Sequence, residues 1–137
     1  MEQKTKAYIA PGAVVTGDVV LEADVSIWYN AVLRGDSGTI RVGRGTNIQD
    51  NCVVHEETTI GQYCTVGHGA IVLTGAVIGE NCLIAAGALV TGKTNAPDGS
   101  LILGNPAKVV KTVSKEQKDE IRKDALHYIR LARETLK

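Results

Sequence analysis

Two histidines and a few polar side chains are the groups in this 137-residue chain best suited to carry chemistry. His55 and His68 are two of only three histidines, and imidazole is a good zinc ligand. Arg34 and the adjacent pair Gln49 and Asp50 occupy related places in a repeating pattern. These residue types favour a metal-binding or acid–base site, if the fold brings them to one surface.

The elements that must position these groups follow a six-residue repeat. An aliphatic residue recurs every six positions from Val42 to Val90, and a second ladder with the same spacing runs from Ile9 to Leu33. This period is neither helical nor that of simple strand alternation. It is typical of a parallel β-helix, in which three hexads form one coil and residues 18 apart stack at about 4.8 Å. We therefore predict an all-β prism of about five coils, with the ladder residues pointing inward.

The phase of the repeat places the candidate residues on the prism. Between Leu33 and Val42 the spacing is nine, so three extra residues, within positions 37–39, are expected to bulge outward. Two outward columns then form on adjoining faces: Arg34, His55, Leu73 and Thr91 in one, and Asp50, His68 and Ala86 in the other. One chain does not easily converge both histidines on one metal ion. Threefold packing of prisms would let His55 of one chain face His68 of the next, and a catalytic zinc typically has three protein ligands plus water.

The pattern lapses after Val90. We expect a turn or loop over residues 92–100 and a last strand over residues 101–103. Ser114 with Gln117 forms a capping box, which predicts a helix over about residues 114–136, lying along the prism or against a neighbouring subunit. The chain is predicted to be a single domain, residues 1–137, with the β-helix over about residues 8–103.

Composition excludes several classes of protein. The formal charge is zero without a basic run, which argues against nucleic-acid binding. No apolar stretch approaches the ~20 residues of a membrane span, and the N-terminus lacks the apolar core of a signal peptide. Three cysteines without metal-type spacing indicate the reducing cytoplasm. All three, Cys52, Cys64 and Cys82, fall at inward positions and are predicted to be core residues.

An ordered set of motifs resembles the γ-class carbonic anhydrases over nearly the whole chain. The matching segments are residues 30–36, 46–51, 53–55, 60–61, 66–70, 97–101 and 104–110, and the C-terminal helix with Tyr128. The resemblance implies a left-handed β-helix and a homotrimer with metal sites between subunits. It also implies zinc, or another divalent metal such as iron or cobalt, and CO₂ and bicarbonate as small-molecule substrates. In that family the metal lowers the pKa of bound water towards ~7, which provides a hydroxide nucleophile for CO₂.

By that resemblance, individual residues acquire expected roles. His55 and His68 match two of the three zinc-binding histidines. Arg34 and Asp36 match an interface pair, for which a purely structural role in holding the trimer is the alternative. The other candidates for the catalytic set are Gln49, beside the metal-bound water, with Asn47 and Asp50 supporting it, and also Glu56 and Tyr128.

The third histidine of the family pattern is missing. Its position, five residues after the Gly-His-Gly motif, is Leu73 here. The simplest explanation is that one 18-residue coil carrying that histidine is absent, because removing a whole coil keeps every hexad in phase. Glu56 or Glu57 is a possible replacement ligand, and a proton-shuttle role is the alternative for Glu56. His127 is predicted to be a packing or surface residue.

Three functions stay open at this point. The leading one is a γ-carbonic-anhydrase-like protein that hydrates CO₂ through a metal hydroxide, with a site that lacks one ligand. The second is a hexapeptide-repeat acyl- or acetyl-CoA transferase with His55 or His68 as general base. The third is a non-catalytic trimeric scaffold.

Trp28 is predicted to point outward into a subunit interface.

Overall fold

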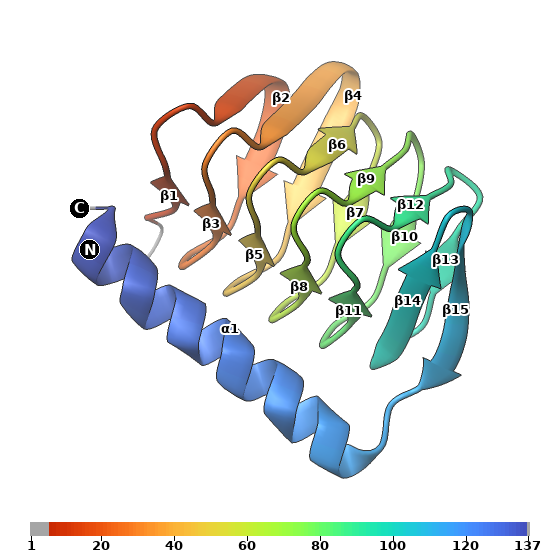
Figure 1. Ribbon diagram of the computed structural model, residues 1–137. Coiled ribbons are helices and arrows are strands. Elements are labelled where there is room, and N and C mark those ends of the chain that lie inside the picture. The colour runs from red at the N-terminus through yellow and green to blue at the C-terminus, as the bar shows by residue number, and fades with distance from the viewer. Residues whose placement is uncertain (1–5, 137) are drawn as a thin grey trace.

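The computed structural model describes residues 6–136. It shows a left-handed parallel β-helix of about five coils followed by one helix (Figure 1). The strands are β1 Tyr8–Ile9, β2 Val14–Leu21, β3 Ser26–Ile27, β4 Val32–Val42, β5 Asn47–Ile48, β6 Val53–His55, β7 Thr59–Ile60, β8 Thr65–Val66, β9 Ile71–Val72, β10 Val77–Ile78, β11 Leu83–Ile84, β12 Leu89–Val90, β13 Asn95–Ala96, β14 Ser100–Gly104 and β15 Ala107–Thr112. The helix, α1, spans Lys115–Thr135.

The strands stack into three faces. Face A consists of β1, β3, β5, β8, β11 and β14, with β15 added antiparallel at its end. Face B consists of the first parts of β2 and β4 followed by β6, β9 and β12, and face C of the later parts of β2 and β4 followed by β7, β10 and β13. Residues 18 apart pair in parallel along each face, such as Val53 with Ile71 and Val77 with Asn95. The predicted coil of three hexads is therefore confirmed.

The ladder residues form the core. Ile48, Val54 and Val66 are among many that have no exposed surface, and the three cysteines are equally buried. Burying such an aliphatic side chain contributes about 1.5–3 kcal/mol, so the stacked rungs are the main stabilising element of the prism.

The predicted bulge lies at the corner between faces B and C. Gly17 pairs with Gly35, but Val19 pairs with Ile40, so β4 carries three more residues than β2 at this corner. The pairing of Leu33 with Val54 follows from the same shift. We call residues 36–39 the bulge.

The prediction that the pattern lapses after Val90 was wrong. Strand β13 continues the ladder through Ala96, which is 2% exposed and pairs with Ile78. The short alanine side chain and the turn residues that follow it hid this rung from sequence reasoning. The expected last strand exists as β14, but it continues into a hairpin with β15, which was not predicted.

Helix α1 packs along face A of its own prism (Figure 1). The capping box of Ser114 and Gln117 is confirmed, and Ile121, Ala125, Ile129 and Ala132 form the buried stripe. At the β1 end of the prism, Arg133 pairs with the buried Asp24 at 2.8 Å. Within residues 6–136, no helix is long and apolar enough to cross a membrane.

The expectation for Trp28 needs correction. Its side chain does point away from the prism, but it is only 4% exposed because α1 covers it. The indole contacts the Tyr128 ring at a centroid distance of 5.5 Å and donates a hydrogen bond to Ser26. Trp28 therefore anchors the helix of its own chain.

Candidate functional site

Arg34 and His55 lie side by side on face B. They are a register pair between β4 and β6, and the pairing of Val54 with Val72 places Leu73 in the next position of the same column. His55 and Leu73 are both half-buried, and Arg34 is exposed. We call Arg34, His55 and Leu73 the outer column. The predicted stacking of residue 73 on His55 is therefore confirmed.

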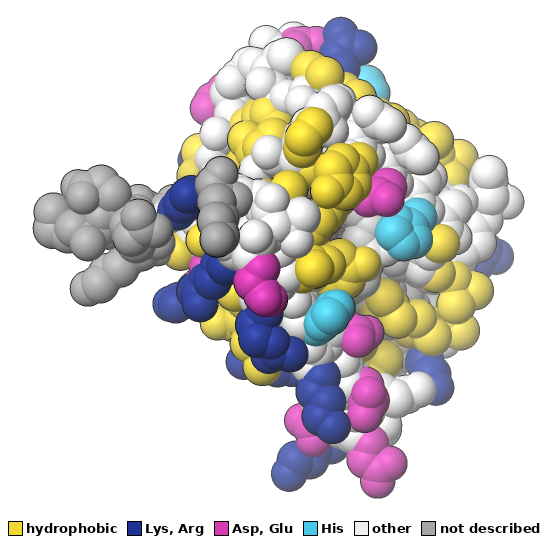
Figure 2. All heavy atoms as spheres, turned by 60° about the vertical axis from the view of Figure 1, so that its left-hand side comes forward, with side chains coloured by type: hydrophobic (Ala, Val, Ile, Leu, Met, Phe, Trp, Pro, Cys, Tyr) yellow, Lys and Arg dark blue, Asp and Glu magenta, His cyan; other side chains and the backbone are white. Residues whose placement is uncertain are grey.

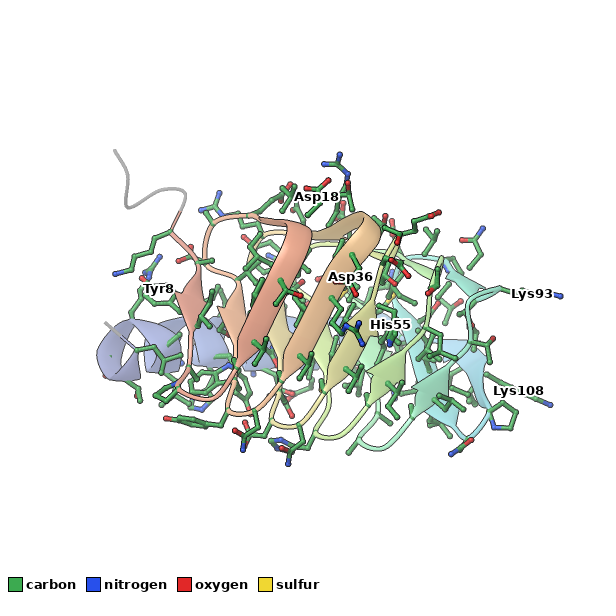
Figure 3. All side chains as sticks on the ribbon, turned by 90° about the horizontal axis from the view of Figure 1, so that it is seen from above. Tyr8, Asp18, Asp36, His55, Lys93 and Lys108 are labelled. Atoms are coloured by element: carbon green, nitrogen blue, oxygen red, sulfur yellow. The ribbon has the colours of Figure 1, made fainter. Side chains whose placement is uncertain are left out.

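Asp36 holds the guanidinium of Arg34. Its Oδ2 accepts hydrogen bonds from Nε at 3.1 Å and from Nη2 at 2.7 Å. In Figure 3, Asp36 and His55 lie close together on the face that looks toward the viewer. About half of each side chain in the Arg34–Asp36 pair is exposed, 54% and 46%, so in a single chain the pair adds little stability. The pair orients Arg34 beside His55.

His68 lies on a different surface, the corner between faces A and B. The amide of Gly69 donates to the Asp50 carbonyl and that of Gly87 to the His68 carbonyl, which confirms the predicted column of Asp50, His68 and Ala86. His68 is exposed and Asp50 half-buried. Figure 2 shows histidine and acidic side chains bordering apolar surface on one face of the molecule. The two metal-type histidines thus do not converge within one chain.

A buried amide network supports Gln49. Asn47 has no exposed surface, and its Nδ2 donates to the Thr65 hydroxyl at 3.1 Å and the Cys64 carbonyl at 3.3 Å. This fixes Oδ1 of Asn47 as the acceptor for Nε2 of Gln49, at 3.0 Å. The carbonyl oxygen of the Gln49 side chain is then available to accept a hydrogen bond. Thr65 was missed by sequence reasoning, and its place 18 residues after Asn47 was the available signal.

The side chain of Tyr128, on α1, lies near Asp50 at the corner between faces A and B. Burial raises the pKa of its hydroxyl, and the negative charges of Asp50 and Asp124 raise it further. Its ring packs between Trp28 and His127, with centroid distances of 5.5 and 5.7 Å. Tyr128 is therefore a neutral group near Asp50 at neutral pH.

Glu56 follows His55 but is engaged elsewhere. Its Oε2 accepts a hydrogen bond from the backbone N–H of Ser37, in the bulge, at 2.6 Å. Ser37 was not among the predicted site residues, and the three-residue insertion was the only signal for it. The predicted roles of Glu56 as replacement ligand or proton shuttle stay predictions.

The possible metal ligands within one chain do not form a complete site for a catalytic zinc ion. Residues 6–136 contain no group of three or more His, Cys, Asp or Glu side chains placed to hold a metal ion. A site between subunits would draw His55 from one chain and His68 from another, and the position over His55 is an apolar Leu73. Two imidazoles are suitable for weak binding of a divalent ion, but they do not match the three-ligand sites of catalytic zinc.

Comparisons with known proteins find both carbonic anhydrases and hexapeptide transferases. Residues 57–92 match the family described as bacterial transferase hexapeptide (six repeats). A probable carbonic anhydrase of Methanocaldococcus jannaschii is 44% identical, covering 93% of this chain and 93% of the relative. The mitochondrial gamma carbonic anhydrase 1 of Arabidopsis thaliana is 38% identical over 93% of this chain, which spans only 56% of that protein. The crystal structure of a hexapeptide transferase family protein from Anaplasma phagocytophilum is 36% identical, with a TM-score of 0.66, and covers 96% of this chain and 94% of its own.

The alignment lengths bear on the missing coil. The match to the archaeal relative spans 149 positions, whereas 93% of this 137-residue chain is about 127 residues, so about 22 positions have no counterpart here. One 18-residue coil accounts for most of that difference. The alignment is therefore consistent with the loss of a coil.

Proposed function

Because the chain belongs to the γ-class carbonic anhydrase family, we propose that it is a homotrimeric carbonic-anhydrase-like protein with a reduced metal site between subunits. His55 of one subunit and His68 of the next are the proposed metal-binding groups, for zinc or for iron or cobalt. The observation that carries the proposal is the outer column, in which Arg34 and His55 are present and Leu73 stands where another ligand would complete the set. The three free, buried cysteines support the cytoplasm as its compartment.

The residues of the chain have distinct proposed tasks. His55 and His68 would hold the divalent metal, which, when bound, would provide a hydroxide nucleophile for CO₂. Gln49, held by Asn47, offers a fixed acceptor beside that site, and Asp50 supports this corner. Arg34 and Asp36 present a charged pair at the subunit boundary, and Tyr128 stays protonated near Asp50. With two histidines, we expect weak metal retention and correspondingly slow hydration of CO₂.

Metal analysis tests this proposal. Protein purified without chelator should form a trimer and carry less than one metal ion per chain, and His55→Ala and His68→Ala should each abolish the remainder. Hydration of CO₂, followed by stopped flow, should rise when Zn²⁺, Fe²⁺ or Co²⁺ is added and should not rise in either variant. Metal-free protein that stays inactive with excess metal would contradict the proposal.

A second candidate, an acyl-CoA transferase, is favoured by the match of residues 57–92 to the transferase hexapeptide family. In that case His55 or His68 is the general base for an acceptor hydroxyl or amine. Thermal stabilisation by acetyl-CoA, lost in the histidine variants, would support it. A trimer that shows neither metal-dependent hydration nor CoA binding would instead be a scaffold.

A further inference from the structure

The corner between faces B and C holds the bulge from two sides. Below it, Asp18 in the first coil accepts a hydrogen bond from the Thr39 hydroxyl through Oδ2 at 2.5 Å. Above it, Glu56 accepts from the Ser37 N–H at 2.6 Å. The side chain of Glu57 also lies against Gly38, where an added Cβ would collide with it. Three successive coils therefore meet at this corner through side chains of the first and third.

The strand ladder does not position Asp36. The register between β2 and β4 is regular up to Gly35 and resumes only at Ile40. Asp36 is the first residue of the segment between these points, so its backbone lacks a register partner in the coil below. Its backbone is therefore held by Gly35 on one side and by the corner contacts of the bulge on the other.

We propose that Glu56 is a positioning residue whose carboxylate fixes the bulge and thereby holds Asp36, and through it Arg34, beside His55. The bond to Ser37 is short and charge-assisted, which makes it stronger than a neutral hydrogen bond. Ser37 follows Asp36 directly, so fixing its N–H fixes the peptide that carries Asp36. Oδ2 of Asp36 then accepts hydrogen bonds from Nε and Nη2 of Arg34.

A positioning residue, a metal ligand and a proton shuttle need different chemical groups at position 56. Positioning requires only an oxygen that accepts a hydrogen bond, which a glutamine side chain also has. A proton shuttle requires a group that titrates, and a metal ligand of this type is a carboxylate. Replacing Glu56 by Gln or by Ala therefore separates the roles.

Hydrogen exchange of the full-length protein provides the direct test. In Glu56→Ala the Ser37 amide should exchange roughly tenfold faster or more, because its acceptor is gone. In Glu56→Gln the exchange rate should rise by only about threefold, because the acceptor oxygen remains and only its charge is lost. Glu57→Gln is the matched control, one residue away with its side-chain length preserved, and should leave the rate unchanged. Equal loss of protection in Glu56→Gln and Glu56→Ala would overturn the proposal.

Metal retention supplies the second readout, and this part rests on the proposed function. Glu56→Gln should retain metal as the wild type does, whereas Glu56→Ala should retain less because Asp36 and Arg34 are released. Loss of metal or of CO₂ hydration in Glu56→Gln, with the Ser37 amide still protected, would overturn the positioning role in favour of a ligand or shuttle. If the wild type binds no metal, the proposed function fails, and the exchange rates still decide whether Glu56 holds the bulge.

Discussion

Two columns of stacked side chains on the prism differ in whether their members play the same role in every coil. The inner column, Thr46, Cys64, Cys82 and Ser100, lies at the corner that leads into face A, with members 18 residues apart. Each of its first three side chains does the same two things. It accepts the backbone N–H of the next member, at 3.0, 3.4 and 3.4 Å, and it donates to a carbonyl 15 residues further along the chain. The outer column of Arg34, His55 and Leu73 has no such common task.

The difference explains how a coil can be lost without loss of the fold. Each inner-column residue before the last finds an equivalent partner in the coil that comes next, whether its side chain ends in a hydroxyl or a thiol. In the outer column, by contrast, a site forms only if each coil provides the right residue. Removing 18 residues therefore preserves the core and its hydrogen bonds but changes the residue above His55.

The largest expected effect is on stability, and it should differ between an inward-facing and an outward-facing residue of β11. Ile84→Ala removes a side chain with no exposed surface and should lower the free energy of unfolding by about 2–5 kcal/mol. Leu83→Ala, on the half-buried outer side of β11, should cost less than half as much. Urea unfolding at one fixed protein concentration measures both, since the stability of an oligomer depends on its concentration. Equal losses would mean that the rungs do not dominate stability.

The next effect concerns the outer column. Leu73→His places an imidazole beside His55 and should tighten binding of Zn²⁺ by roughly 100-fold or more, because even indirect partners of metal ligands change affinity about 10–100-fold. Competition against a chelator of known affinity measures this gain. Leu73→Gln is the control, being polar but a poor zinc ligand. No difference between the two variants would show that position 73 does not face the proposed metal site.

The sequence allowed prediction of the periodic part of the molecule in detail. The inward ladder, the bulge after Leu33, the stacking of Leu73 on His55 and the capping box at Ser114 all follow from counting residues, because each depends on local spacing. Ala96 was missed because a small rung among turn residues gives little hydrophobic signal.

Contacts between elements far apart in sequence were harder to predict. The packing of Trp28 against Tyr128 requires the direction in which α1 returns along face A. The hydrogen bond from the Ser37 N–H to Glu56 depends on the conformation of the bulge, which lies outside the repeat. Neither leaves a periodic trace, so both required the structure.

A smaller effect tests the inner column. Cys64→Thr and Cys64→Val have nearly the same shape, but only Thr retains a group that accepts from the Cys82 N–H and donates to the Gly79 carbonyl. Cys64→Val should therefore be less stable than Cys64→Thr by about 1–3 kcal/mol, the cost of leaving buried polar groups unpaired. Chemical denaturation of both variants measures the difference. Equal stability would show that volume alone matters at this corner.

The smallest effect concerns the corner where Tyr128 meets Asp50. Burial and the two neighbouring carboxylates hold the Tyr128 pKa above its ordinary value, so Asp50→Asn should lower that pKa. Ultraviolet titration measures it, with Tyr128→Phe subtracted to remove the other tyrosines. A folded-state pKa raised above the unfolded value of about 10 contributes stability that is present below pH 10 and is lost as the pH rises through the folded pKa. Asp50→Asn should reduce this pH dependence, and an unchanged titration would show that Asp50 does not influence the Tyr128 hydroxyl.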